Sequence, residues 1–137
     1  MTQYFVDTNI FLRLLLKDDQ EMHQKAELLF EKAEKGKFKL WTTDVVILEI
    51  VWTLKALYDY PKENIKIAVS GLFGIENLKI QNRPLLISAL NDHVTYNVDF
   101  ADAYNYQLAQ KEGFKILSFD KHFDRIGKRE NIERLIK

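Results

Sequence analysis

Two aspartates follow short apolar stretches that are typical of buried strands, and carboxylates in such places could hold a metal ion. Asp7 comes directly after residues 3–6, and Asp120 comes directly after residues 115–119. If the strands are parallel, both side chains belong at the carboxyl ends of strands, where open parallel sheets place their ligand sites. Asp7 could instead cap the helix that follows, although the next two residues could also provide that cap. For Asp120, a role in a turn or cap stays an equal alternative.

A third carboxylate, Glu49, interrupts a helical segment over residues 45–52 that is otherwise apolar. An apolar helix of this kind is predicted to be buried on most faces. A buried carboxylate without a partner costs several kcal/mol or takes up a proton. We therefore interpret Glu49 as a site residue, and an ion pair, for example with Lys55, is the alternative.

The segment Asp99-Phe100-Ala101-Asp102-Ala103 carries a further pair of acids, three residues apart at the start of a predicted helix. Side chains at this spacing share one face of a helix. By itself the pair has a structural explanation, because acids in a first helical turn complement the helix dipole. We predict that Asp99 is the N-cap residue, with its side chain bonded to the backbone N–H groups of the first turn. Asp102 lies one turn deeper.

Together, four acidic positions are more informative than each is separately: Asp7, Glu49, Asp102 and Asp120. Hard cations such as Mg²⁺ prefer oxygen ligands and use one or two carboxylates together with waters and phosphates. Carboxylates held within about 4 Å of each other repel strongly unless a cation neutralises them. A bound metal also activates water and stabilises charge on phosphate oxygens. These residues would form such a site if the ends of their elements converge.

Length and composition favour one folded domain over residues 1–137 with a substantial core, because 47% of the chain is apolar. The absence of cysteine excludes disulfides and thiolate metal sites. No apolar run approaches the roughly 20 residues of a membrane span, and no signal-peptide pattern opens the chain, so we expect a cytoplasmic protein without a membrane partner.

Twenty acids balance twenty bases, so composition does not indicate nucleic-acid binding. No glycine-rich phosphate loop or G-x-S-x-G motif is present.

The predicted elements alternate between strands and helices, which indicates an α/β fold with a mainly parallel sheet. Strands are predicted at residues 3–6, 38–41, 78–80, 115–119 and 132–136. Helices are predicted from apolar spacings of three and four, from caps and from helix-ending glycines, at about residues 10–16, 20–35, 44–58, 61–71, 84–94 and 99–113.

Four stretches in this order resemble the PIN domain, and more closely the VapC-type toxins of prokaryotic toxin–antitoxin modules. The first two are Phe5-Val6-Asp7-Thr8-Asn9-Ile10 and the run from Thr42 to Trp52. The other two are the segment from Asp99 to Ala103 and the run from Ser118 to Ile126. They span nearly the whole chain, and four stretches in register are more specific than any one of them.

The resemblance implies a three-layer α/β/α fold with about five strands and an endoribonuclease activity that uses Mg²⁺ or Mn²⁺. By motif position it assigns the acidic quartet to Asp7, Glu49, Asp102 and Asp120, with Asp7, Asp102 and Asp120 as metal ligands. It also implies that Thr8 helps to order the site. The partners it implies are an RNA substrate, a cognate antitoxin and a second copy of the chain in a homodimer.

Two alternatives stay open at this point. The chain could be a DNA-directed nuclease with the same site, or a PIN module that binds RNA or protein without cleavage. Seven basic residues are candidates for phosphate contacts, although solvated surface charge explains each of them as well: Lys17, Lys55, Lys121, His122, Arg125, Lys128 and Arg129.

Overall fold

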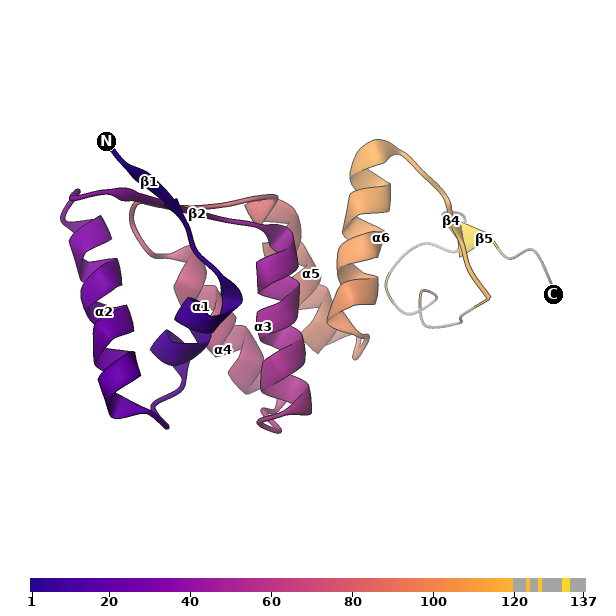
Figure 1. Ribbon diagram of the computed structural model, residues 1–137. Helices are drawn as coiled ribbons and strands as arrows, with labels where there is room; N and C mark the ends of the chain where they lie inside the picture. The colour runs from indigo at the N-terminus through magenta and orange to yellow at the C-terminus, as the bar shows by residue number, and fades with distance from the viewer. Residues whose placement is uncertain (120–122, 124–125, 127–131, 134–137) are drawn as a thin grey trace. The chain divides into compact units, whose positions relative to one another are not determined.

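The computed structural model describes residues 1–119, 123, 126 and 132–133 (Figure 1). The chain divides into two compact units, residues 1–83 and residues 84–137. The prediction of one domain over residues 1–137 stays a prediction.

The first unit alternates strands and helices as the sequence predicts. Its elements follow in the order β1 (Gln3–Phe5), α1 (Thr8–Leu15), α2 (Gln20–Glu34), β2 (Lys39–Thr42), α3 (Asp44–Ala56), α4 (Lys62–Phe73) and β3 (Leu78–Ile80). The ends of the helices match the residues expected to cap them. Thr43 accepts a hydrogen bond from the backbone N–H of Val46 at the start of α3, and Gly36 has a positive φ of 80° just after α2.

The three strands of this unit form a parallel sheet in the order β1-β2-β3. Tyr4 is the register partner of Leu40, and Leu40 is the partner of Leu78. The connections from β1 to β2 and from β2 to β3 run in the same direction along the sheet. Because crossovers between parallel strands are right-handed, both connections place their helices, α1 to α4, on the same face. In Figure 1 these helices lie below the strands.

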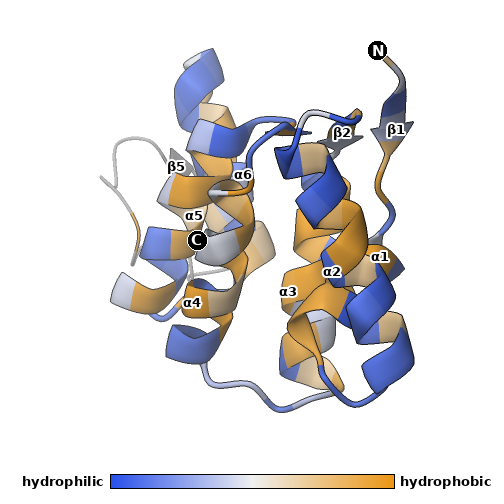
Figure 2. Ribbon diagram, turned by 90° about the vertical axis from the view of Figure 1, so that its left-hand side faces the viewer, coloured by the Kyte–Doolittle hydropathy of each residue, from blue (hydrophilic) through white to orange (hydrophobic). Residues whose placement is uncertain are grey.

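Burial alternates along β2 and β3 because successive side chains point to opposite faces. Leu40, Thr42, Leu78 and Ile80 are buried, whereas the residues between them are exposed. The buried set packs against the helices, and Figure 2 shows α3 coloured hydrophobic along most of its length.

The centre of this core is made by side chains of α1, α2 and α3. Phe11 of α1 is fully buried, and its ring centre lies 5.5 Å from that of Phe30 on α2. Ile47, Ile50 and Leu54 of α3 are also fully buried. Burial of each such side chain contributes roughly 1.5–3 kcal/mol, so this core fixes α1 and α3, the helices that follow the carboxyl ends of β1 and β2.

The second unit contains α5 (Arg83–Thr95), whose first residue belongs to the preceding unit, α6 (Phe100–Glu112), β4 (Ile116–Leu117) and β5 (Ile132–Glu133). Pro84 lies just inside the start of α5, and Gly113 ends α6 in a left-handed conformation with a φ of 72°. The two strands pair in parallel, with Ile116 opposite Ile132. A hydrogen bond of 2.7 Å joins the side chains of Gln107 on α6 and Asp92 on α5.

The predicted α/β class with parallel strands is confirmed. Among the described residues, the strands form one ladder of three and one ladder of two. The predicted strands at 115–119 and 132–136 are present but shorter, at two residues each.

Candidate active site

Asp7 lies at the carboxyl end of the first strand. The ladder continues one residue past β1, because the backbone N–H of Val6 donates to the carbonyl of Trp41 at 2.8 Å. Asp7 then takes the N-cap position of α1 in an extended conformation, but its side chain makes no capping hydrogen bond. The carboxylate is exposed at this edge of the sheet. The capping explanation of Asp7 is therefore not supported by the contacts of its side chain.

Thr8 and Glu49 connect the start of α1 to the middle of α3. The hydroxyl of Thr8 donates a hydrogen bond of 2.6 Å to Oε2 of Glu49, across 41 residues of sequence. Thr8 is buried, with 7% of its surface exposed, so the donor is held in place by its surroundings. The bond brings the Glu49 carboxylate to the residue that directly follows Asp7. The structure thus brings two of the four predicted site residues to the same end of the sheet.

The prediction that Glu49 is buried is wrong. Glu49 is exposed, and so are Val45 and Trp52, the residues four before and three after it. These three positions share one face of α3. Because the neighbours of Glu49 on this face are apolar, the exposure of the face could not be predicted from the sequence. Within the described part of the chain, Glu49 also has no cation at ion-pair distance, so the alternative of a pair with Lys55 finds no support.

Thr42 and Asp44 hold the end of β2 and the start of α3 in place. Thr42 is fully buried and donates from its hydroxyl to the carbonyl of Val6 at 2.9 Å, which ties the ends of β1 and β2 together. Asp44 accepts hydrogen bonds from the backbone of Val45 at 2.8 Å and from the side chain of Asn82 at 3.3 Å. Asp44 therefore serves the start of α3. Thr42 was not among the predicted site residues, although a threonine at the end of a predicted strand is a usable signal for such a bond.

Of the two acids at the start of α6, Asp99 and Asp102, only Asp99 differs from the predicted arrangement. Asp99 is the N-cap residue by position, but its side chain makes no capping hydrogen bond. The predicted cap bond is therefore wrong, and Asp99 contributes to the first turn through its backbone carbonyl, which accepts a 2.9 Å hydrogen bond from the N–H of Ala103. Asp102 lies in the first turn of α6 and is half-buried. The fourth acid, Asp120, lies outside the described residues.

Some of the basic residues that are candidates for phosphate contacts lie within the described residues, and the others lie outside them. Lys17 and Lys55 are exposed. The other five lie outside the described residues: Lys121, His122, Arg125, Lys128 and Arg129.

The donor set at the end of β1 and β2 suits a hard cation. Asp7 supplies an exposed carboxylate, and Thr8 occupies only one of the four oxygen lone-pair directions of Glu49. Mg²⁺ is commonly bound by one or two carboxylates with waters and substrate phosphates in the other positions. Among residues 1–119 and the few described beyond them, no three or more His, Cys, Asp or Glu side chains are gathered in a ready metal cluster. A cation held here would therefore take most of its ligands from water and substrate and not from a closed protein cage.

No helix within the described ranges is both long enough and apolar enough to cross a membrane.

Comparison with known proteins agrees with the motifs. The family model of the PIN domain matches residues 4–129. A protein of Aquifex aeolicus (strain VF5) described as a VapC ribonuclease is 25% identical over 123 residues, which cover 89% of this chain and 90% of that protein. The crystal structure of VapC20 of Mycobacterium tuberculosis, a toxin that cleaves the sarcin-ricin loop, is 19% identical, with a TM-score of 0.43. That match covers 92% of this chain and 95% of the other.

Proposed function

Because this chain belongs to the PIN domain family, we propose that it is a metal-dependent endoribonuclease and the toxin component of a toxin–antitoxin module. The observation that carries the proposal is the hydrogen bond from Thr8 to Glu49. Thr8 directly follows Asp7 in the sequence, so the bond holds the Glu49 carboxylate beside the neighbour of Asp7. The likeness to a protein described as a VapC ribonuclease over 89% of the chain supports RNA as the substrate.

The residues proposed for catalysis are Asp7, Glu49, Asp102 and Asp120. Asp7, Asp102 and Asp120 would hold Mg²⁺ or Mn²⁺, directly or through water. When bound, the cation would stabilise negative charge on the phosphate oxygens and lower the pKa of a bound water. The assignment of Asp102 and Asp120 depends on their positions in the family motifs.

Glu49 would orient the attacking water in this mechanism. Its Oε2 accepts the hydrogen bond from Thr8, which fixes the rotation of the carboxylate and leaves Oε1 to accept a hydrogen bond from water. A water held in this way is positioned before it reacts, and such positioning lowers the entropic part of the barrier. The water oxygen forms a bond to phosphorus while the bond to the 3′-oxygen breaks. The water gives up one proton as it attacks and the leaving 3′-oxygen takes one up, so the products are a 5′-phosphate and a 3′-hydroxyl.

The proposed partners follow from the same family membership. We propose that the chain forms a homodimer and that a cognate antitoxin blocks its site. A short reading frame beside the gene would support the presence of an antitoxin.

One experiment distinguishes this proposal from the two alternatives, a DNA-directed nuclease and a PIN module that binds without cleavage. The full chain is incubated with labelled RNA and labelled single-stranded DNA, in Mn²⁺ and in EDTA. Cleavage of RNA only in Mn²⁺ supports the proposal. Preferential cleavage of DNA would support the DNA nuclease, and binding of RNA without cleavage would support a binding module.

A further inference from the structure

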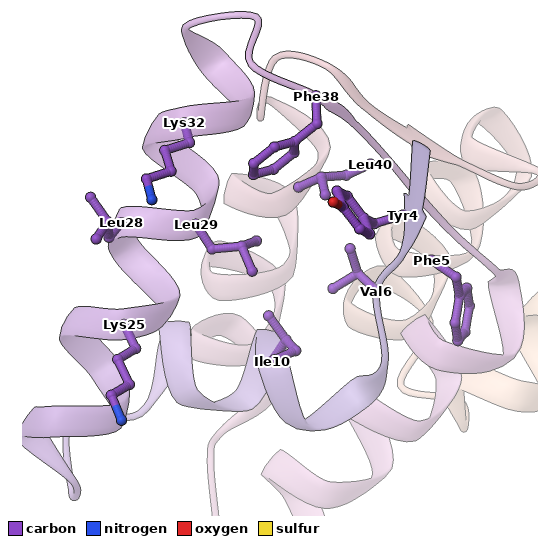
Figure 3. Close-up of a pocket in the computed structure, with 10 residues that line it drawn as sticks. All are labelled: Tyr4, Phe5, Val6, Ile10, Lys25, Leu28, Leu29, Lys32, Phe38 and Leu40. Carbon is purple, nitrogen blue, oxygen red and sulfur yellow. The ribbon is translucent and has the colours of Figure 1, made fainter. Parts of the chain in front are cut away.

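The sheet of the first unit carries a row of two aromatic residues and a lysine on the face opposite α1 to α4. Phe5, Trp41 and Lys79 are register partners on β1, β2 and β3, so their side chains stand side by side across the sheet. Neighbouring strands lie about 4.8 Å apart, which makes the row roughly 10 Å wide. Figure 3 shows the ring of Phe5 on the side of β1 away from Tyr4, Val6 and α2. All three side chains of the row are exposed.

The two aromatic rings of the row are exposed next to each other. Phe5 is 56% exposed and Trp41 is 36% exposed. Their ring centres lie 5.8 Å apart, with an angle of 51° between the ring planes. The rings are therefore tilted and not stacked on each other, so a flat ligand can still stack on them. Neighbouring exposed apolar groups that are rimmed by polar ones are typical of interaction surfaces.

Positive charge surrounds the aromatic rings. A hollow of about 530 Å³ on this side of the sheet is lined by Trp41 and by three cations, Lys39, Lys79 and Arg83. None of the described residues that line the hollow is acidic. Within the described part of the chain, neither lysine has a carboxylate at ion-pair distance. Arg83 donates to the carbonyl of Phe73, and a guanidinium has five N–H donors, so others can contact a ligand.

This local excess of cations occurs in a chain whose net charge is zero. Composition alone therefore conceals a surface that is complementary to an anion. Two amide side chains complete it, because Gln3 is the register partner of Lys39 and Asn77 also lines the hollow. Amides both donate and accept hydrogen bonds, as the edges of nucleobases do.

The combination of rings and cations favours one class of ligand. An acidic protein would match the cations alone, whereas a nucleotide chain offers flat bases as well as anionic phosphates. Surfaces that bind single-stranded nucleic acids combine aromatic side chains, on which bases stack, with positive charge along the backbone of the strand.

We propose that this face of the sheet binds single-stranded RNA, with bases stacked on the two rings and phosphates at the cations. Phe5 lies two residues before Asp7, and two residues of a strand span about 7 Å. The face would therefore hold RNA beside the end of the sheet at which Asp7 lies. The inference assigns a surface that holds RNA apart from the acids proposed for cleavage, and it rests on the proposed function only in the choice of RNA over DNA.

The test measures binding of the full chain to a fluorescein-labelled oligouridylate of about 12 nucleotides, a length within the range that such surfaces cover. Fluorescence anisotropy is recorded in EDTA at several salt concentrations, and a gel checks that the RNA stays intact. Trp41→Ala removes one ring, and Trp41→Phe keeps a ring at the same position. A double variant, Lys39→Gln with Lys79→Gln, removes two charges.

The matched controls change residues of the same types elsewhere in the first unit. Tyr58→Ala removes an aromatic side chain that is 42% exposed. Lys32→Gln with Lys35→Gln removes two exposed lysines at the end of α2. None of these three residues lines the hollow. Thermal melts check that each variant folds, and the lysine variants, which remove no ring, decide the case if Trp41→Ala does not fold.

We expect Trp41→Ala to weaken binding about fivefold to a hundredfold, as the loss of one stacked base does. Trp41→Phe should recover most of the affinity. The double variant at Lys39 and Lys79 should lower the slope of log affinity against log salt by about 1.4, because each phosphate contact on a single strand contributes about 0.7. The aromatic control should bind as wild type, and the lysine control should keep the wild-type slope.

Three results would overturn the proposal: no binding by wild type, equal affinity of folded Trp41→Ala, or an unchanged salt slope in the double variant. A Trp41→Ala variant that changes a dimer into a monomer in analytical ultracentrifugation, and still binds RNA as wild type does, would assign the face to contact between copies. Cleavage of RNA in Mn²⁺ together with unchanged affinities would overturn this inference alone. Binding through this face without cleavage would support it and overturn the proposed function instead.

Discussion

The hydroxyl of Thr8 donates a 2.6 Å hydrogen bond to the carboxylate of Glu49, joining the first turn of α1 to the middle of α3. The donor is buried and the acceptor is exposed. The core around Phe11 and Ile47 therefore fixes the donor, while the acceptor stays open to water and to substrate. A change in either residue should affect the orientation of the carboxylate more than the stability of the fold.

Replacement of Thr8 by valine removes the hydroxyl and keeps the branched shape. A hydrogen bond to a charged group contributes about 1.5–3 kcal/mol, so we expect the cleavage rate to fall about tenfold to a hundredfold. Single-turnover rates on labelled RNA measure the effect. Thr8→Ser is the control and should retain most of the rate. Equal rates for the valine and serine variants would show that the bond does not orient Glu49.

Replacement of Glu49 by glutamine should abolish most cleavage and leave the free energy of unfolding within about 0.5 kcal/mol of wild type. The side chain is exposed, and the amide oxygen can still accept the bond from Thr8. Urea unfolding and single-turnover rates provide the two measurements. If the variant still cleaves RNA but is several kcal/mol less stable, Glu49 is a structural residue.

The helix caps allow a matched comparison of stability. Asp19 accepts a hydrogen bond from the backbone N–H of Met22 at 3.1 Å, whereas Asp99 makes no such bond. We expect Asp19→Ala to cost about 1 kcal/mol and Asp99→Ala about 0.5 kcal/mol or less, from the helix dipole. Thermal melts compare the two variants. An equal cost would indicate that the Asp99 side chain caps α6 in solution.

Most of the fold could be predicted from the sequence because local signals agree. Apolar spacing, Thr43, Gly36 and Gly113 mark helices and their ends, and the structure confirms them. The pairing of the strands could not be predicted in the same way, because partners such as Leu40 and Leu78 are distant in sequence.

The assignment of the four acids to a site stays a prediction, and the conformations of their side chains could not be predicted from the sequence. The exposure of Glu49 was not predictable, because Val45 and Trp52 beside it are apolar yet exposed. The side chain of Asp99 was expected to cap because its type and position are favourable, but rotamers depend on tertiary contacts that the sequence does not display. The bond from Thr42 to Val6 joins residues 36 apart, so it follows only from the strand pairing.

Metal should stabilise the native state through the proposed ligands. A ligand that binds only the folded chain adds about 2.7 kcal/mol at a hundredfold excess over its Kd. We therefore expect a higher melting temperature in Mn²⁺ than in EDTA, with a smaller gain in Asp7→Asn. Differential scanning fluorimetry measures both. An equal gain in the two proteins would remove Asp7 from the metal site.

We propose above all that this chain hydrolyses RNA through metal held by its acidic residues. The most direct measurement is the chemistry of the ends produced from a labelled RNA by wild type and by Asp7→Asn, in Mn²⁺ and in EDTA. We expect wild type in Mn²⁺ to produce 5′-phosphate and 3′-hydroxyl ends, with at least about a hundredfold less product from the variant, as for loss of one strong transition-state contact. Equal product in EDTA, equal product from Asp7→Asn, or 2′,3′-cyclic phosphate ends would contradict the claim.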